Sequence, residues 1–152
     1  AFGLYHNLEK GLELSIKETF RILSSGGRVC ASFRADNIQT RLTDWLAERR
    51  SKNLVINDNA SSFHKMNLTK KEFIDIFKNA GFLVESVSPV ENMPILYKFK
   101  FFRSYNHKNF DENKARAEGY QLSWLGKILQ KSLMLILPNQ FCNIYVLIAE
   151  RP

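Results

Sequence analysis

Apolar residues change their spacing along the first 34 positions of the chain. They first recur every three or four residues, which predicts a surface helix with one buried face that Asn7 caps. The recurring positions are Leu8, Leu12, Ile16, Phe20 and Leu23. Gly26 and Gly27 then end the helix at little conformational cost, and residues 28–34 alternate apolar and polar side chains as a strand does. A helix that leads so directly into a buried strand is typical of an α/β fold with a parallel sheet.

Capping residues place the elements that follow. Asp36 or Asn37 can cap a second helix, and Thr69 with Glu72 forms a capping box at the start of a third, which Gly81 ends. The pattern therefore predicts a helix over 36–50, a polar loop over 51–62, a helix over 69–81 and a strand over 82–90.

Residues 91–140 separate that strand from the last one. Within them, residues 97–102 alternate in a way that predicts a strand with one buried and one wet face, and 111–118 predict a polar helix. Residues 123–137 predict a helix whose apolar stripe packs as a lid, with attachment to a membrane surface as the less favoured alternative. Residues 141–149 are apolar on both faces, which predicts a strand in the middle of the sheet.

Composition limits the class of protein. A chain of 152 residues with 45% hydrophobic content is expected to form one domain. Its net charge of +7 permits an anionic partner such as nucleic acid or a membrane surface, although acidic residues elsewhere in the protein would explain it equally well. Cys30 and Cys142 lie in predicted strands and are expected to be reduced core thiols of a cytoplasmic protein. Neither a signal peptide nor a membrane-spanning segment is expected.

Two segments resemble class I S-adenosylmethionine-dependent methyltransferases. Residues 18–28, E-T-F-R-I-L-S-S-G-G-R, are similar to the family's E-x-x-R-v-L-k-P-G-G-x stretch before its fifth strand, with Ser25 where proline is usual. Residues 69–82, which end in A-G-F, are similar to the helix before the sixth strand. Together with the order of the elements, these segments resemble the C-terminal half of such an enzyme, of the UbiE/methyltransferase-domain type.

The resemblance implies a three-layer Rossmann-like sheet, mostly parallel with an antiparallel last strand, from which the N-terminal strands are missing. Residues 1–6 would end the fourth strand, and 141–149 would be the seventh, inserted between the fifth and the sixth. Residues 91–140 would form an insert that caps the substrate. The chain contains no G-x-G sequence to supply the family's cofactor loop. The resemblance therefore implies half of a methyltransferase domain, which is not expected to bind S-adenosylmethionine by itself.

Candidate site residues follow from the rule that ligands of open α/β sheets bind beyond the carboxyl ends of the strands. This rule selects Tyr5, His6 and Arg34. The resemblance implies that Tyr5 and His6 face the methyl acceptor, and that the cofactor is bordered by Ala1, Phe2 and Gly3. His6 could accept a proton from a hydroxyl or amine, or it could be a structural histidine near a helix N-terminus.

Two arginines are candidates for substrate binding. Arg34 could bind an acidic group or pair with Asp36 or Asp44, and Arg103 belongs to a basic cluster interleaved with Phe and Tyr. Such a cluster would suit nucleic acid, although alternating aromatic residues are also typical of a core strand. The cluster comprises Lys98, Lys100, Arg103, His107 and Lys108. The histidines and cysteines lack metal-ligand spacing, so no metal site is expected.

Two functions are consistent with these features. The first is a methyltransferase fragment that transfers a methyl group to an unidentified acceptor and is inactive alone. The alternative is a non-catalytic basic binding module, with nucleic acid as its ligand, built on half of the same fold. The missing strands would place residues 28–34 near a sheet edge with Val29, Ala31 and Phe33 uncovered, which predicts a homodimer or pairing with an N-terminal half.

Overall fold

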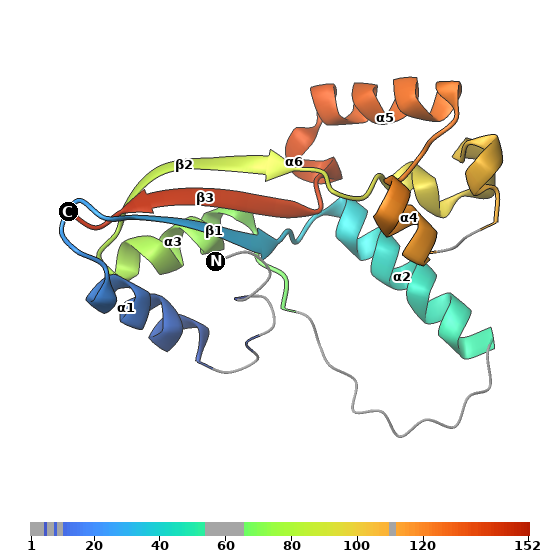
Figure 1. Ribbon diagram of the computed structural model, residues 1–152. Coiled ribbons are helices and arrows are strands. Elements are labelled where there is room, and N and C mark those ends of the chain that lie inside the picture. Colours follow the sequence, from blue (N-terminus) through green and yellow to red (C-terminus); the bar gives the residue numbers. More distant parts are fainter. Residues whose placement is uncertain (1–4, 6–7, 9–10, 54–65, 110–111) are drawn as a thin grey trace.

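Three strands form the sheet in the part of the chain that the computed structural model describes, which is residues 5, 8, 11–53, 66–109 and 112–152. The strands are β1 (Arg28–Arg34), β2 (Leu83–Val90) and β3 (Ile144–Glu150), in the order β1–β3–β2. β3 pairs antiparallel with both neighbours, so β1 and β2 run in the same direction (Figure 1). The expected place of the last strand, in the middle of the sheet and antiparallel, is confirmed.

The expected mostly parallel sheet is not found, because the pairs between these three strands are all antiparallel. The position of β3 explains the difference: it separates the two strands that share a direction and pairs with each in the opposite sense. Of residues 1–6, expected to end a further strand, only Tyr5 is described, and it lies in a 3-10 turn. The predicted N-terminal end of the sheet thus lies outside the described residues.

The helices fall into two groups. Two of them, α1 (Leu12–Ile22) and α3 (Lys70–Asn79), lie along one face of the sheet (Figure 1). The others lie beyond the carboxyl ends of β1 and β2, as do several short 3-10 turns (Figure 1). This second group comprises α2 (Ile38–Asn53), η2 (Ile95–Lys98), η3 (Lys100–Phe102), η4 (Tyr105–His107), α4 (Glu112–Glu118), α5 (Trp124–Ile136) and α6 (Pro138–Phe141).

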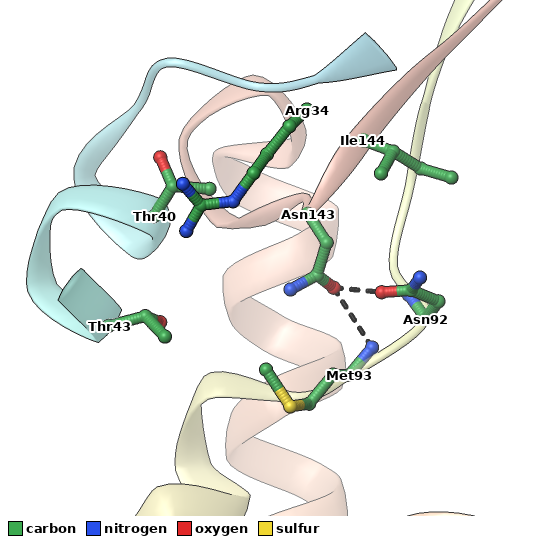
Figure 2. A pocket seen from close by; sticks show the side chains of 7 residues that line it. All are labelled: Arg34, Thr40, Thr43, Asn92, Met93, Asn143 and Ile144. Atoms are coloured by element: carbon green, nitrogen blue, oxygen red, sulfur yellow. Dashed lines mark hydrogen bonds between the residues drawn. The ribbon is translucent and has the colours of Figure 1, made fainter. Parts of the chain in front are cut away.

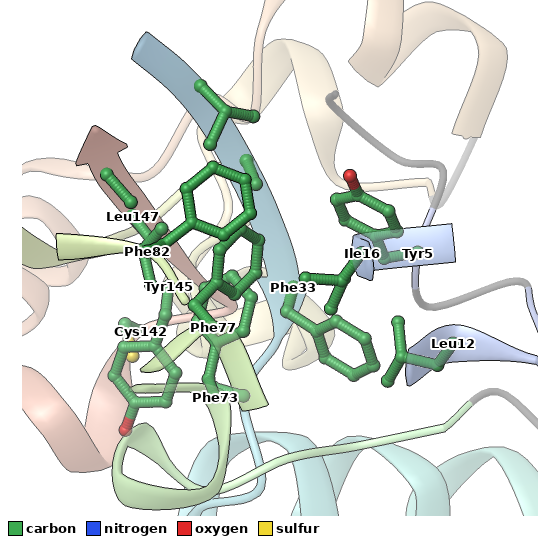
Figure 3. Close-up of a cluster of buried hydrophobic side chains, with 14 residues drawn as sticks. Tyr5, Leu12, Ile16, Phe33, Phe73, Phe77, Phe82, Cys142, Tyr145 and Leu147 are labelled. Atoms are coloured by element: carbon green, nitrogen blue, oxygen red, sulfur yellow. The ribbon is translucent and has the colours of Figure 1, made fainter. Parts of the chain in front are cut away.

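The main core fills the space between the sheet and the first group of helices (Figure 3). Phe73 and Phe77 of α3 meet edge to face at 5.4 Å, and Phe33 of β1 packs on Phe73 at 5.6 Å between ring centroids. Val29, Ala31 and Phe33 are buried in this core, so the expectation that they would be uncovered is wrong. Their side chains project onto the face of the sheet that the helices cover.

A bulge in β2 keeps its apolar residues on the core face. Val84 pairs with Ala149 and Ser86 with Ile148, which leaves Glu85 as an extra residue in β2. Without it, Val84 and Val87 would point to opposite faces, because side chains alternate along a strand. With it, both pack against the core.

The opposite face of the sheet is largely open, which is the second departure from the expected three-layer fold. Ile148 of the central strand is 36% exposed, and Cys30, Ser86 and Ser88 are also exposed. The prediction that Cys30 is a buried thiol is therefore wrong, whereas Cys142 is buried as expected. The sheet and its helices form two layers in the described part of the chain.

Local signals account for the starts of α2 and α3 but not for the start of α1. Thr69 and Glu72 form the predicted capping box, and the side-chain oxygen of Asn37 accepts a hydrogen bond from the Thr40 N–H at 3.0 Å, as a cap of α2 should. The exception is α1, which begins at Leu12 instead of after Asn7. Gly11 adopts a left-handed φ of 91° that interrupts helical backbone at that point.

The strand predicted over residues 97–102 is wrong, since these residues form the turns η2 and η3. Arg103 supplies the reason. Its guanidinium donates hydrogen bonds to the carbonyls of Tyr97 at 2.7 Å and of Lys98 and Lys108 at 3.1 Å, so these groups are satisfied without a neighbouring strand. A second core forms around this network from Ile95, Leu96, Tyr97, Ala115 and Leu122.

Candidate functional site

A cavity of about 200 Å³ opens where β1 and β2 end and β3 begins (Figure 2). Its walls come from segments far apart in the sequence: the end of β1, the first turns of α2, the residues after β2 and the residue before β3. It is lined by Arg34, Thr40, Thr43, Asn92, Met93, Asn143 and Ile144. The cavity therefore lies at the position that the strand-end rule predicts for a ligand.

Asn143 ties these segments together. Its Oδ1 accepts hydrogen bonds from the backbone N–H groups of Asn92 at 3.1 Å and Met93 at 2.9 Å (Figure 2). Its own N–H donates to the Val90 carbonyl at 3.0 Å, and its carbonyl accepts from the Ala35 N–H at 3.0 Å. One residue thus fixes the ends of all three strands. Its amide nitrogen points away from these bonds, toward the cavity (Figure 2).

Arg34 forms the positive wall of the cavity. Its guanidinium binds Asp44 in a bidentate pair, with N–O distances of 2.6 and 3.0 Å, and donates to Asn67 Oδ1 at 2.6 Å. The predicted pairing with Asp44 is present, whereas Asp36 pairs with Arg41 at 2.9 Å. These bonds use three of the five N–H donors of the guanidinium. The group is thereby held rigidly with donors left for a ligand.

A buried polar network holds the first turn of α2 behind the cavity. Thr40 Oγ1 donates to the Ala35 carbonyl at 2.6 Å, and the amide of Asn37 donates to the Cys142 carbonyl at 2.8 Å. The same amide donates to the Asn139 carbonyl at 3.0 Å. Buried polar groups that are satisfied in this way specify one arrangement of the backbone. The cavity wall is therefore preorganised.

The groups beneath the cavity stay protonated at neutral pH. Burial raises the pKa of the Cys142 thiol and raises the pKa of Tyr145 to about 12. No histidine, cysteine or carboxylate is among the described residues that line the cavity. The described lining residues therefore offer hydrogen-bond donors and apolar contact for positioning a ligand.

A second cavity, of about 380 Å³, lies on the other side of residues 91–94. Glu91 and Gln130 line it, and the Gln130 amide donates to the Glu91 carboxylate at 3.0 Å. Burial raises the pKa of Glu91 above its usual value, and this hydrogen bond opposes the rise.

The structure brings only part of the predicted site together. Of the described candidates, Arg34 lines the first cavity and Tyr5 and Arg103 do not. Tyr5 is buried in the main core, where its hydroxyl lies 2.9 Å from Thr19 Oγ1 and its ring meets Phe77 edge to face. Arg103 is buried among the carbonyls that it binds. The remaining candidates lie outside the described residues: Ala1, Phe2, Gly3 and His6.

The proposed nucleic-acid cluster is also divided. Arg103 and His107 are buried, and His107 bridges Tyr97 and Glu118 through its two ring nitrogens at 2.9 and 3.0 Å. Lys100 and Lys108 are exposed. The basic residues of this segment therefore do not share one surface.

Sequence reasoning missed Asn92 and Asn143. The rule about carboxyl ends, applied to the strand that ends at Val90, would have selected Asn92. Asn143 carried a weaker signal, because only the antiparallel insertion of β3 brings the start of that strand to the same end of the sheet.

Comparison with known proteins supports the α/β architecture. No family model matches the sequence, and no curated protein sequence matches it. A similar solved structure is a Haloferax volcanii protein described as a methyltransferase, in complex with the methyltransferase activator Trm112. The match has a TM-score of 0.53 and 10% sequence identity, and it covers 99% of this chain and 51% of the Haloferax volcanii chain. Another is a protein of Bacillus halodurans C-125 described as a methyltransferase, with a TM-score of 0.50 at 9% identity over 99% of this chain and 67% of that one. The chain thus spans about half to two thirds of these proteins and has a fold similar to theirs.

Proposed function

We propose that this chain forms the acceptor-binding part of an S-adenosylmethionine-dependent methyltransferase. One observation supports this most: an antiparallel strand lies between two strands of common direction, with a preorganised cavity where the common strands end. The likeness to methyltransferase structures over 99% of the chain agrees with it.

The described residues do not fit the cofactor itself. Pockets that enclose a ligand of that size have volumes of about 300 Å³ or more, whereas this cavity measures about 200 Å³. It contains no carboxylate for a ribose, and the chain has no G-x-G turn that would bring backbone N–H groups against the ligand. The proposal therefore assigns the acceptor, and not the cofactor, to this cavity.

The lining residues define the class of acceptor. The guanidinium of Arg34 and the amide nitrogen of Asn143 are donors, so they suit an oxygen atom that is neutral or carries negative charge. Met93 and Ile144 add apolar contact. Methyl transfer depends mainly on positioning and on the exclusion of water, which a rigid cavity without a base can provide. We therefore propose a small, oxygen-bearing acceptor.

The test combines binding with transfer. In ¹⁵N-labelled protein, small carboxylates and phenols are expected to shift the backbone signals of Asn92, Met93 and Asn143. Radiolabelled S-adenosylmethionine, supplied to the complete gene product with the compounds that bind, is expected to yield a methylated compound. Binding of a compound without any methyl transfer would contradict the proposed methyltransferase activity and would favour a non-catalytic binding module.

An oligonucleotide at two salt concentrations tests the alternative function. If it binds tightly at 50 mM salt, and the binding is lost on replacing Lys98 and Lys100 by Glu, the nucleic-acid module is correct and our proposal is wrong. We expect no such binding, because Arg103 and His107 of the same cluster are buried.

The proposal includes a polypeptide partner. A polypeptide partner is supported by one of the similar structures, in which the Haloferax volcanii protein is in complex with the methyltransferase activator Trm112. For this chain, the proposed partner is a second copy or an N-terminal half. A clean monomer in light scattering at 100 µM would count against a homodimer.

A further inference from the structure

α5 presents its apolar residues to the outside and its small and polar residues to the inside. The residues buried in this helix are Gly126 and Gln130. Trp124 is 77% exposed and Leu135 is 82% exposed. The full set of exposed apolar residues on α5 is Trp124, Leu125, Ile128, Leu129, Leu135 and Ile136. This is the reverse of a surface helix, which buries its apolar stripe, and the expected packing of that stripe as a lid is therefore wrong.

Specific contacts fix α5 in this orientation. A Cβ atom on Gly126 would lie 2.6 Å from the Phe102 carbonyl oxygen, so only glycine allows the helix to approach so closely. The side-chain oxygen of Gln130 accepts a hydrogen bond from the Leu96 N–H at 3.3 Å, while its amide binds Glu91. Ser123 caps the helix by accepting from the Gly126 N–H. Rotation of the apolar face inward would break all of these contacts.

The segment beside the start of α5 also exposes aromatic residues. Residues 102–104 are tied to the start of α5, since the Ser104 N–H donates to the Gln121 carbonyl at 3.0 Å and the Ser123 N–H to the Phe102 carbonyl at 2.8 Å. On either side of this link, Phe101 and Tyr105 are among the most exposed aromatic residues. α5 lies at the outer margin of the molecule in Figure 1. Exposed apolar surface of this extent marks an interaction site.

The charge of this region is positive. Lys127 and Lys131 lie on α5 and are exposed, and residues 119–149 contain no aspartate or glutamate. Residues 91–140 as a whole contain eight Lys and Arg against four Asp and Glu. Glu91 lines the second cavity together with both lysines, and its carboxylate accepts a hydrogen bond from the Gln130 amide. An apolar helix face bordered by lysines and tryptophan is the pattern of helices that lie in a lipid interface.

We propose that the outer face of α5 binds the surface of a membrane that contains anionic lipid. The 13-residue helix would lie in the plane of the interface, with its apolar side chains among the acyl chains and its lysines at the phosphates. No helix in the described part of the chain is long and apolar enough to cross a membrane. This inference does not depend on the methyltransferase proposal, because none of the outward-facing apolar residues lines the first cavity.

The test measures binding to lipid vesicles. Trp45→Phe leaves Trp124 as the remaining tryptophan, and its fluorescence is expected to shift to shorter wavelength with vesicles of 70% phosphatidylcholine and 30% phosphatidylglycerol. Pure phosphatidylcholine is expected to bind at least about tenfold more weakly, because surface potential attracts the lysines. Equal binding to both vesicles, or to neither, would overturn the proposal.

Matched variants locate the contact. Leu135→Glu is expected to weaken vesicle binding at least about tenfold, whereas Ile22→Glu on α1, which replaces a similarly exposed residue, is expected to leave it unchanged. Lys127→Glu with Lys131→Glu is expected to abolish the preference for anionic lipid. Equal effects of Leu135→Glu and Ile22→Glu would contradict the proposal. The proposal would also be contradicted if the protein forms a dimer that Leu135→Glu dissociates and does not bind vesicles, since the face would then join two copies.

Discussion

Replacement of Asn143 by Ala or by Asp separates two roles of its side chain. The Oδ1 atom holds the backbone of Asn92 and Met93, while the amide nitrogen faces the cavity. Asn143→Ala removes both functions. Asn143→Asp keeps an oxygen for the two N–H groups, removes the donor and adds a negative charge near Arg34. The two variants should therefore differ in their free energy of unfolding, whereas both should bind the ligand more weakly than the wild-type chain.

The magnitude follows from the two hydrogen bonds. Each contributes about 0.5–1.5 kcal/mol, and the bond to Asn92 belongs at the low end because that residue is exposed. We expect Asn143→Ala to lower the free energy of unfolding by about 1–2 kcal/mol and Asn143→Asp by less than about 0.5 kcal/mol. For a protein of this length, the first value lowers the melting temperature by about 2–8 °C. Urea titration followed by circular dichroism measures both.

Ligand binding gives the second readout. Both variants should weaken binding of a small carboxylate at least about tenfold, and Asn143→Asp should weaken it more, because the introduced carboxylate repels the ligand. If Asn143→Asp destabilises the protein as much as Asn143→Ala, Oδ1 does not hold the strand ends as described. If either variant binds the carboxylate like the wild-type chain, the cavity is not the acceptor site.

The remaining predictions concern the core, a helix cap and the pH dependence of folding. Phe33→Ala should cost about 3–5 kcal/mol because the ring is fully buried against Phe73, and a loss below 1 kcal/mol in urea titration would contradict that packing. Thr69→Ala should cost about 1 kcal/mol through loss of the capping box, with unfolding measured at pH 7; no loss would mean that the cap is not formed. The raised pKa of Tyr145, about 12, means that its neutral form is favoured in the folded state. Its contribution to stability is therefore complete below pH 10 and is lost as the pH rises toward 12, and Tyr145→Phe should reduce this loss in a pH series of unfolding curves.

Local signals in the sequence predicted local structure well. The capping box of Thr69 and the cap at Asn37 involve atoms within four residues of one another, so the sequence contains both partners of each bond. The central strand was also predictable, because apolar residues on both faces of residues 144–149 require neighbours on each side. The order of the strands then followed from the resemblance to methyltransferases.

The prediction for residues 97–102 was wrong because contacts between side chains and distant backbone groups determine the structure there. The alternation of Tyr97, Phe99 and Phe101 has the period of a strand, but a strand needs a partner for its backbone groups. Arg103 satisfies two of the carbonyls instead, and nothing in the spacing of the residues shows where its side chain would go. The candidate site was missed for a related reason, since Asn92 and Asn143 are 51 positions apart and meet only through the pairing of β2 with β3.

The open face of the sheet and the outer face of α5 differ in chemistry, and this difference favours different partners. The open face of the sheet is built from small side chains such as Cys30 and Ser86 around Ile148, and its charged residues are paired, since Arg28 binds Glu85 and Glu150. Such a flat surface without unbalanced charge suits packing against another polypeptide layer. The outer face of α5 carries large side chains and is bordered by Lys127 and Lys131. A polypeptide partner would have to supply acidic groups around an apolar groove to match it, whereas an anionic membrane supplies both features at once. A variant that blocks the sheet face should therefore change association between polypeptides and leave vesicle binding intact.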